Sequence, residues 1–292
     1  MENVSLAGAP AIVRPPQSDG GGAPVIVLWH GFGPPGSKKA LADLLPLDDV
    51  PAWKVYPDLP LFGERLPEGG IDELTRRQLS DYVLDLLLPI AEQAVVELPQ
   101  LVREVERQYG ADASGGIGLF GFSGGAATAI HALLDGSVPV RAAVFAGAPP
   151  SLGVAVANVE RGMRAEAERL RASYDWFEDR MLTYEWTEAS EAARSQFDLR
   201  GRAPEVAAAD RPPAVLLLHG QRDEMFAVDD AEAIGEALRA AYRESGASER
   251  TEVRTFPHLM HHLDPEAGTD AERDLADLRE AVVGWYNRYL LA

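Results

Sequence analysis

The sequence predicts an α/β fold in which a mostly parallel sheet is flanked by helices. Short apolar runs that suit buried strands alternate along the chain with longer runs in which apolar residues recur at helical spacing. Apolar strands that alternate with amphipathic helices form parallel sheets that are covered on both faces. With 292 residues, of which 46% are hydrophobic, the chain is long enough to bury a substantial core.

The expected strands are runs rich in aliphatic, β-branched and aromatic residues. They are Val25–Trp29, Trp53–Tyr56, Ile117–Phe122, Val140–Ala146, Val215–His219 and Glu252–Phe256. The short run Ala11–Val13 is a weaker candidate and would lie at an edge of the sheet. In an open parallel sheet, ligands bind at the carboxyl ends of the strands, so this is where we expect the functional site.

The expected helices lie between these strands and carry an apolar face. They are Lys38–Leu45, Ile71–Tyr109, Gly124–Leu134, Asp230–Tyr242 and Ala271–Leu290. The second run is interrupted at Pro89, with Pro99 as a further candidate for a break, because proline does not fit inside a helix. In the last run, Leu275, Leu278 and Val282 fall on one face.

One segment does not fit the alternation of strands and helices. It is helical, charged and rich in aromatic residues, so we expect residues 151–199 to form a helical cap over a core made of residues 1–150 and 200–292. Ligand pockets are mostly apolar, and some of its rings are therefore expected to line one. The candidates are Trp176, Phe177 and Trp186, together with Phe226 outside the segment. The alternative is that these rings only attach the cap to the core.

The run Gly121–Gly125 reads Gly-Phe-Ser-Gly-Gly, with an apolar run before it and a helical run after it. A sharp strand-to-helix turn leaves its central residue strained and exposed, while the flanking glycines let the two elements approach closely. The helix N-terminus adds free N–H groups that suit a developing oxyanion. Ser123 is therefore the candidate nucleophile, since the strand–turn–helix context disfavours an ordinary turn.

A serine hydroxyl needs a base, and the base needs an acid that orients it. Asp223 follows a predicted strand in the order Ser, Asp, His that this motif predicts, and Glu224 is the competing acid. The candidates for the base are His258, His261 and His262, and spacing alone does not choose among them. A metal site formed by these histidines is disfavoured, because no further ligand stands at metal-binding spacing.

Composition and charge exclude several classes of function. The absence of cysteine excludes disulfides, a cysteine nucleophile and a thiolate metal site. The net charge of −19 argues against nucleic-acid binding, which needs a basic surface. Neither a signal peptide nor a membrane-spanning run is recognisable, so we expect a cytoplasmic protein that does not bind membranes.

Four motifs together make the chain resemble the α/β-hydrolase family, within it the serine esterases and the dienelactone-hydrolase-like or prolyl-oligopeptidase-like members. They are His30–Gly33, Pro57–Arg65, Gly121–Gly125 and His219–Asp223. The resemblance implies an oxyanion hole made by the backbone N–H groups of Phe32 and Gly124. It also selects His261 as the base, because the family's last motif often reads His-x-aliphatic-x-Pro-Glu, and His261–Glu266 is similar to it.

The resemblance implies the α/β-hydrolase fold and a serine hydrolase that cleaves a small to medium carboxylic ester through an acyl-enzyme. Ser123, Asp223 and His261 would form the catalytic triad, with no metal and no cofactor. An acylaminoacyl or peptide hydrolase is the nearest enzymatic alternative, and a non-catalytic sensor of a small ligand is the alternative from another class. The expected partner is a small-molecule ester, and the sequence is compatible with a homodimer.

Overall fold

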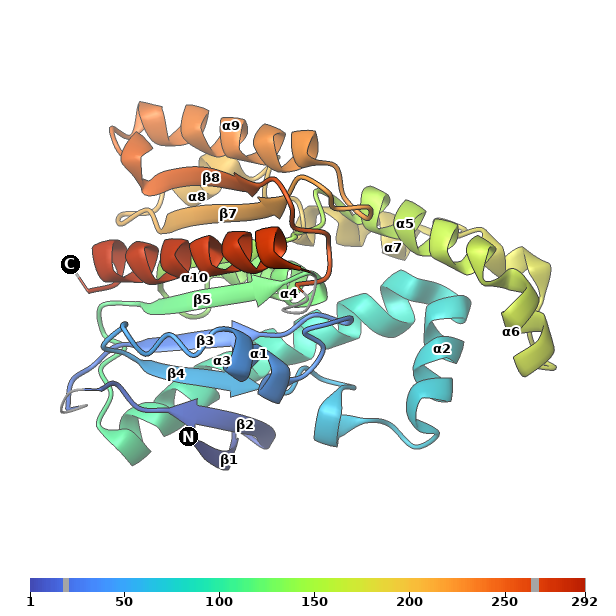
Figure 1. The fold of residues 1–292 in the computed structure, drawn as a ribbon, viewed down its shortest axis with the longest axis horizontal. Coiled ribbons are helices and arrows are strands. Elements are labelled where there is room, and N and C mark those ends of the chain that lie inside the picture. Colours follow the sequence, from blue (N-terminus) through green and yellow to red (C-terminus); the bar gives the residue numbers. More distant parts are fainter. Residues whose placement is uncertain (18–20, 264–267, 292) are drawn as a thin grey trace.

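The protein is built around one eight-stranded sheet with helices on both faces (Figure 1). The computed structural model describes residues 1–17, 21–263 and 268–291. The strand order is β1-β2-β4-β3-β5-β6-β7-β8, and the strands from β3 to β8 are parallel to one another, whereas β1 and β2 run antiparallel to their neighbours. This architecture confirms the α/β fold that the sequence predicts.

The strand bounds agree closely with the apolar runs of the sequence. The strands are β1 (Glu2–Leu6), β2 (Ala9–Arg14), β3 (Val25–Trp29), β4 (Trp53–Pro57), β5 (Ile117–Phe122), β6 (Val140–Ala146), β7 (Ala214–Gly220) and β8 (Thr251–Phe256). Strand β1 was not expected, because most of its residues are exposed at the edge of the sheet and form no apolar run.

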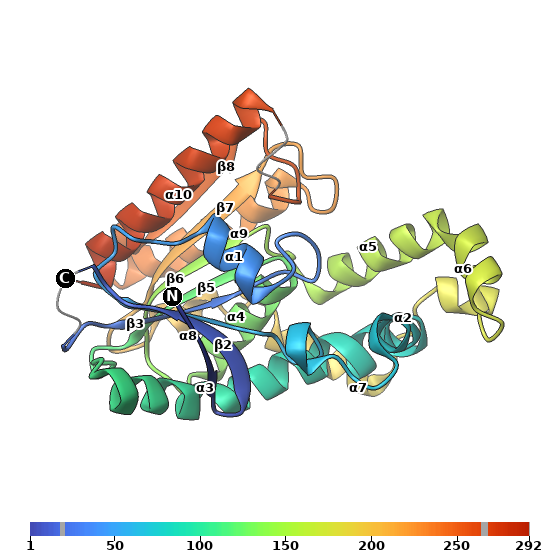
Figure 2. The ribbon, with the colours of Figure 1, turned by 60° about the horizontal axis from the view of Figure 1, so that its bottom comes forward.

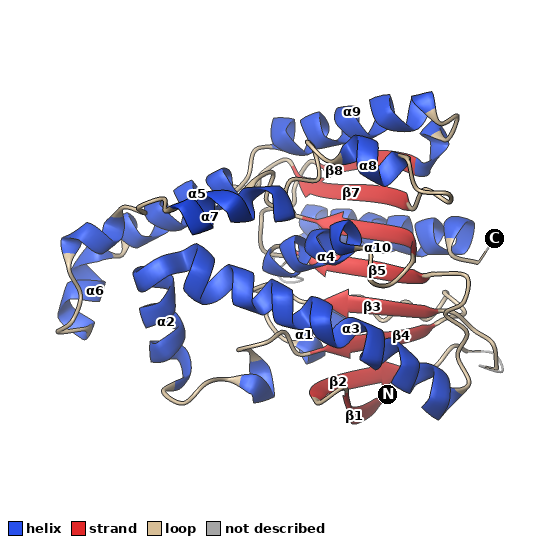
Figure 3. Cartoon of the chain, turned by 180° about the vertical axis from the view of Figure 1, so that it is seen from behind, coloured by secondary structure: helices blue, strands red, loops and turns tan. Residues whose placement is uncertain are grey.

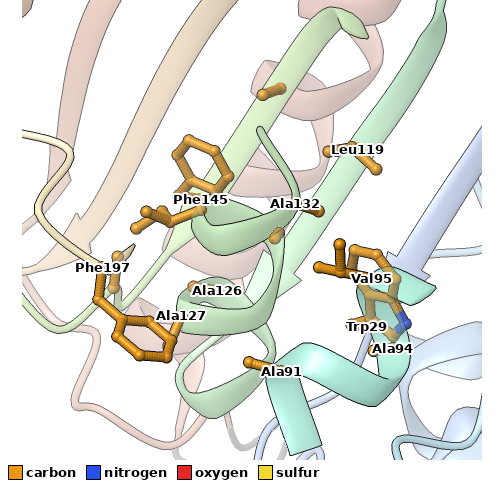
Figure 4. Packing of buried hydrophobic residues seen from close by; sticks show 14 of the residues in the cluster. Trp29, Ala91, Ala94, Val95, Leu119, Ala126, Ala127, Ala132, Phe145 and Phe197 are labelled. Carbon is orange, nitrogen blue, oxygen red and sulfur yellow. The ribbon is translucent and has the colours of Figure 1, made fainter. Parts of the chain in front are cut away.

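Each central strand sends alternate side chains to the two faces of the sheet. From β5, Leu119 joins the hydrophobic cluster under α3 (Leu88–Tyr109) and α4 (Gly124–Asp135), whereas Phe120 joins the cluster under α10 (Thr269–Tyr289). Figure 4 shows part of the first cluster, in which Val95 and Ala94 of α3 lie beside Trp29 of β3. The core is thus two apolar layers separated by the sheet.

The helices divide between the two faces in the same way. Helices α1 (Lys38–Leu44) and α10 cover one face, while α3, α4, α8 (Ala203–Ala207) and α9 (Val228–Glu244) cover the other, as Figures 1 and 3 show from opposite sides. Two short 3₁₀ turns, η1 (Gly63–Arg65) and η5 (Ser248–Arg250), lie in the connections. Among the described residues, no helix combines the length and the apolar content needed to cross a bilayer.

Beyond the carboxyl ends of the strands, two separate segments form a cap that extends away from the sheet (Figures 1 and 2). The first is α2 (Gly70–Asp81) and the π-helical turn η2 (Tyr82–Leu87). The second holds α5 (Leu152–Ala165), α6 (Ala167–Ser173), η3 (Asp179–Leu182), α7 (Glu188–Ala192) and η4 (Ala193–Gln196). Tyrosine hydroxyls tie the two together: Tyr174 donates to Asp72 at 2.8 Å and Tyr184 to Asp81 at 2.7 Å.

The long helical run expected over 71–109 is broken at Asp81, not at Pro89. The Asp81 backbone is extended (φ −153°, ψ 99°), and its carboxylate accepts hydrogen bonds from the N–H groups of Val83 and Leu84. An aspartate that caps the next turn in this way starts a new helix in a new direction. Pro89 is tolerated because it stands in the first turn of α3, where its missing N–H costs no hydrogen bond.

Candidate active site

Ser123 occupies the turn between β5 and α4. Its φ of +52° and ψ of −116° are strained for a residue with a side chain. The Ser123 N–H donates to Ala146 O of the neighbouring strand at 3.0 Å, which fixes the turn against the sheet. The carboxyl end of β5 and the N-terminus of α4 therefore meet at this one residue, as the strand–turn–helix pattern predicts.

The glycines around Ser123 are required by close backbone approaches. A Cβ atom on Gly125 would lie 2.3 Å from His30 O, and one on Gly121 would lie 2.3 Å from Gly125 O. Neither contact can be relieved by moving a side chain, because both neighbours are backbone atoms. Any other residue at these positions would push α4 away from β3 and β5.

We expect Gly125→Ala to destabilise the fold by about 1–3 kcal/mol, as overpacking of a well-packed core does. Thermal and urea unfolding would measure the loss. Gly284→Ala in α10 is the matched control, because a Cβ there meets no atom within 4 Å. Alanine is the better helix former, so the control should be neutral or stabilising. An equal effect of the two substitutions would contradict the steric account of the turn.

The structure brings Ser123, His261 and Asp223 together into one hydrogen-bonded chain. His261 Nε2 lies 2.8 Å from Ser123 Oγ, and His261 Nδ1 lies 2.8 Å from Asp223 Oδ2. The side chains of His261 and Asp223 are each only 1% exposed. Because Asp223 can only accept at Nδ1, the histidine carries its proton there and presents a free acceptor to the serine hydroxyl.

Asp223 is held in its ionised form by several donors. Its Oδ1 accepts the backbone N–H groups of Met225 and Phe226, both at 2.8 Å. Burial alone would raise the pKa of this carboxyl, but the hydrogen bond from His261, the backbone donor and the nearby His219 outweigh burial and lower the pKa below its ordinary value. A buried carboxylate is thus available to orient His261.

The other candidates for acid and base do not form hydrogen bonds to Ser123. His262 lines the same cavity, with its ring centroid 5.7 Å from that of His261. His258 faces Asp274, whose carboxylate accepts the His258 N–H at 2.6 Å. Glu224 approaches His261 only at its backbone, with a distance of 3.4 Å from the His261 N–H to Oε2. No group of three or more His, Asp or Glu side chains in the described ranges is arranged to hold a metal ion. The end of the His261–Glu266 motif lies outside the described residues.

Two residues with free backbone N–H groups line the cavity at Ser123, Gly124 from the start of α4 and Phe32 from the loop after β3. The Gly124 N–H is the first of α4, where no intrahelical acceptor exists. Among the described residues, the Phe32 N–H also has no acceptor. The Phe32 ring packs against Gly124, since a Cβ there would lie 2.5 Å from it, and it stacks on Phe62 at 4.9 Å. The expected pair of oxyanion donors is therefore held together by ring packing.

A buried histidine fixes the loop that carries Phe32. His30 is 0% exposed, lies 2.8 Å from Gly31 O through Nδ1, and accepts the Leu59 N–H at Nε2. Burial lowers the pKa of His30, and the Gly31 carbonyl and Asp58 only partly oppose this effect. His30 is thus a neutral link between this loop and the segment that follows β4, which explains why His-Gly stands directly after β3.

Above Ser123, a cavity of about 260 Å³ lies between the core and both segments of the cap. The core contributes Ser123, Gly124 and His261, and the strand-to-helix connection after β7 contributes Phe226. The remaining lining includes Gln78, Tyr82, Asn158, Val159, Met163, Met225 and His262. Its walls are mostly apolar, and none of the lining residues is Asp, Glu, Lys or Arg.

The comparison with known proteins agrees with this geometry. Residues 26–271, most of the chain, match the model of the alpha/beta hydrolase family. The chain belongs to the α/β-hydrolase family. No curated protein sequence matches this α/β hydrolase significantly.

Solved structures similar to this α/β hydrolase share its fold at low identity. A putative dienelactone hydrolase from Klebsiella pneumoniae is 17% identical, with 96% of this chain and 93% of that one covered and a TM-score of 0.59. The esterase domain of a Rhodothermus marinus protein is 15% identical (99% and 98% covered, TM-score 0.54). The acylaminoacyl peptidase of Pyrococcus horikoshii is 16% identical (96% and 39% covered, TM-score 0.61).

The aromatic residues of the cap are placed differently from the expectation. Of the four rings proposed for the pocket, only Phe226 lines the cavity of this α/β hydrolase. Trp176 and Phe177 pack instead on a small cluster with Leu79 and Met163, which joins the two cap segments. Trp186 lies under the Arg194 guanidinium, 3.6 Å from its ring centroid. Trp176 and Phe177 thus join the two cap segments, whereas Trp186 also packs against the main hydrophobic cluster, as the alternative that the rings attach the cap to the core stated.

Residues that the sequence did not single out supply most of the cavity wall. Tyr82 and Gln78 come from a run taken as a helix flanking the sheet, and Met225 from the turn after Asp223. No motif or spacing marks them, because the cavity exists only where two cap segments meet over the strand ends. The sequence indicated only Met225 and Phe226 as candidates for the wall, because they follow Asp223 closely along the chain.

Proposed function

We propose that this protein is a serine hydrolase that cleaves a small to medium carboxylic ester through an acyl-enzyme. The observation that carries the proposal is the hydrogen-bonded chain from Asp223 through His261 to Ser123, which ends in an apolar cavity. Nucleophile, base and orienting acid stand within hydrogen-bond reach of one another, which is the arrangement that activates a serine.

In the proposed first step, Ser123 Oγ attacks the carbonyl carbon of the ester while His261 Nε2 takes the hydroxyl proton. The electron pair of the carbonyl moves to its oxygen, which accepts hydrogen bonds from the Phe32 and Gly124 N–H groups. Asp223 stabilises the imidazolium that forms. The tetrahedral intermediate then expels the alkoxide, which leaves as the alcohol with the proton from His261.

In the second step, water replaces the alcohol. His261 takes a proton from the water as its oxygen attacks the acyl carbon, and the tetrahedral intermediate again relies on the two backbone donors. Ser123 leaves with the proton from His261, which releases the carboxylic acid and restores the enzyme. The mostly apolar cavity of about 260 Å³ supports an acyl or alcohol group of modest size.

The test is hydrolysis of p-nitrophenyl esters from acetate to laurate, together with N-acetyl-alanine p-nitroanilide. We expect ester turnover that is highest for short or medium chains, that is lost in Ser123→Ala and that is retained in Ser173→Ala, an exposed serine of the cap. Faster cleavage of the anilide would favour the acylaminoacyl or peptide hydrolase. Binding of esters without turnover of any substrate would favour the ligand sensor and contradict the proposal.

A further inference from the structure

The hydroxyl of Tyr82 differs from the other tyrosine hydroxyls of this chain in its hydrogen bonding. Every other tyrosine hydroxyl donates a hydrogen bond to a protein oxygen, whether in the core or on the cap. The acceptors are Leu45 O for Tyr56, Glu2 for Tyr109, Asp72 for Tyr174, Asp81 for Tyr184, Pro213 O for Tyr242, Leu119 O for Tyr286 and Glu249 O for Tyr289. The Tyr82 hydroxyl has no partner among the described residues.

The free hydroxyl of Tyr82 borders the cavity above Ser123. The residue is only 9% exposed, and it lines this cavity. The side-chain polar atoms that are fully enclosed without a partner belong to other residues, namely Arg14, Gln196, Arg250 and His258. The Tyr82 hydroxyl therefore keeps contact with open space, which for a side chain this buried is the cavity.

Buried tyrosine hydroxyls normally find a partner, because a buried donor without one is costly. Burial also raises the pKa of Tyr82 above its ordinary value, so the hydroxyl keeps its proton and remains a donor. The position itself is maintained by an irregular backbone, since η2 is a π-helical turn that begins after the break at Asp81. Such turns occur frequently at functional sites.

A second unpartnered polar group lines the same cavity from the same cap segment as Tyr82. Gln78 also lines the cavity, and its amide has no hydrogen-bond partner in the described part of the chain. Asn158 of α5 also lines the cavity but differs, because its amide donates to Met225 O at 2.8 Å and accepts from Arg161. The cap thus offers two free polar groups on one wall of a mostly apolar cavity.

The charge of the wall restricts what these groups can bind. No lysine or arginine lines the cavity, so a carboxylate or phosphate on the substrate would be buried without either of these counter-charges. A plain hydrocarbon chain would leave the Tyr82 donor unpaired. An uncharged oxygen, such as that of an ether, ketone or hydroxyl group, satisfies the hydroxyl without this cost.

We infer that the natural substrate is an oxygenated, uncharged ester, and that Tyr82 determines this specificity by donating a hydrogen bond to an oxygen of the substrate under the cap. Gln78 stands beside it as a second polar contact. The inference rests on the proposed function, because it assigns the substrate class of the same site. This oxygen belongs to the part of the substrate that lies under the cap, and it is additional to the two oxygens of the scissile ester.

The experiment compares p-nitrophenyl hexanoate with its three analogues in which oxygen replaces CH₂ at carbon 3, 4 or 5. Wild type, Tyr82→Phe and Tyr174→Phe are assayed with all four esters. Tyr174→Phe is the matched control, since it removes a cap hydroxyl that does not line the cavity. Comparison of each ester across the variants cancels its intrinsic reactivity.

We expect Tyr82→Phe to lower kcat/KM for at least one oxygen-containing ester by about 10-fold, as loss of a buried hydrogen bond does, and to leave the hexanoate unchanged or faster. Tyr174→Phe should leave the preference intact. The inference would be overturned if Tyr82→Phe had the wild-type kcat/KM for all four esters, or if it lowered kcat/KM for all four by the same factor.

A binding measurement separates this inference from the proposed function. The methyl esters of the same four acids are titrated calorimetrically into Ser123→Ala and into Ser123→Ala/Tyr82→Phe. A preference for an oxygen-containing ester that is lost in the double variant would uphold the inference even if wild type hydrolysed none of them. Hydrolysis of all four without any preference that depends on Tyr82 would leave the serine hydrolase standing and refute the inference.

Discussion

Ser123→Ala is expected to lower kcat for ester hydrolysis by roughly 10⁶-fold, the size of effect seen when a triad serine is removed. The alanine has no nucleophile, and His261 Nε2 loses the hydroxyl that lies 2.8 Å away. Initial rates on p-nitrophenyl butyrate, corrected for spontaneous hydrolysis, measure the effect. A variant that retains more than a small fraction of wild-type kcat would refute the role of Ser123.

The fold should survive this substitution, which separates loss of chemistry from loss of structure. Alanine keeps the same Cβ atom, so the melting temperature should stay close to that of the wild type. Ser123→Gly should melt at a higher temperature, because glycine accepts the φ of +52° without the strain of about 1–3 kcal/mol that a side chain brings there. A lower melting temperature for Ser123→Gly would contradict the strained turn.

Asp223→Asn is expected to reduce kcat by about 10⁴-fold while leaving the geometry intact. The Met225 and Phe226 N–H groups both point at Oδ1, so the amide oxygen of asparagine will occupy that position. The amide NH₂ then faces His261 Nδ1 and forces the imidazole proton onto Nε2. A histidine in that tautomer cannot accept the proton of Ser123.

Glu224→Gln is the matched control for Asp223→Asn. It removes the neighbouring carboxylate, which approaches only the backbone N–H of His261. We expect kcat of this control to remain near the wild-type value. Loss of activity in Glu224→Gln together with retention in Asp223→Asn would mean that Glu224 is the orienting acid.

The central sheet could be predicted from the sequence because its strands are buried on both faces. Ile117–Phe122 has no polar side chain and Val140–Ala146 only Arg141, and the structure gives both runs these same bounds. Edge strand Glu2–Leu6 carries no such signal, since most of its side chains meet solvent. The helix break at Asp81 could not be predicted either, because an aspartate that caps a new turn inside a helical pattern cannot be distinguished by sequence from an exposed helical residue.

Ser123 and Asp223 were accessible to sequence reasoning because Ser123 follows directly on β5 and Asp223 lies in the connection after β7, whereas His261 was chosen among three histidines after β8 only by the family's last motif. Parallel strands bring Ser123, Asp223 and His261 to one edge of the sheet, and the motifs state their order. No comparable sequence pattern predicts which residues form the cavity wall. Tyr82 and Met163 line one cavity only because two cap segments pack together, and rings such as Trp176 serve that packing.

The most direct test of the account is covalent labelling by a fluorophosphonate, followed by intact mass measurement and peptide mapping. An activated serine displaces fluoride, so wild type should gain one phosphonyl group, located on Ser123. Ser123→Ala should gain none, and His261→Ala should react far more slowly because its serine lacks a base. Wild type that stays unlabelled, or that carries its label on a residue other than Ser123, would contradict the claim that His261 and Asp223 activate this serine.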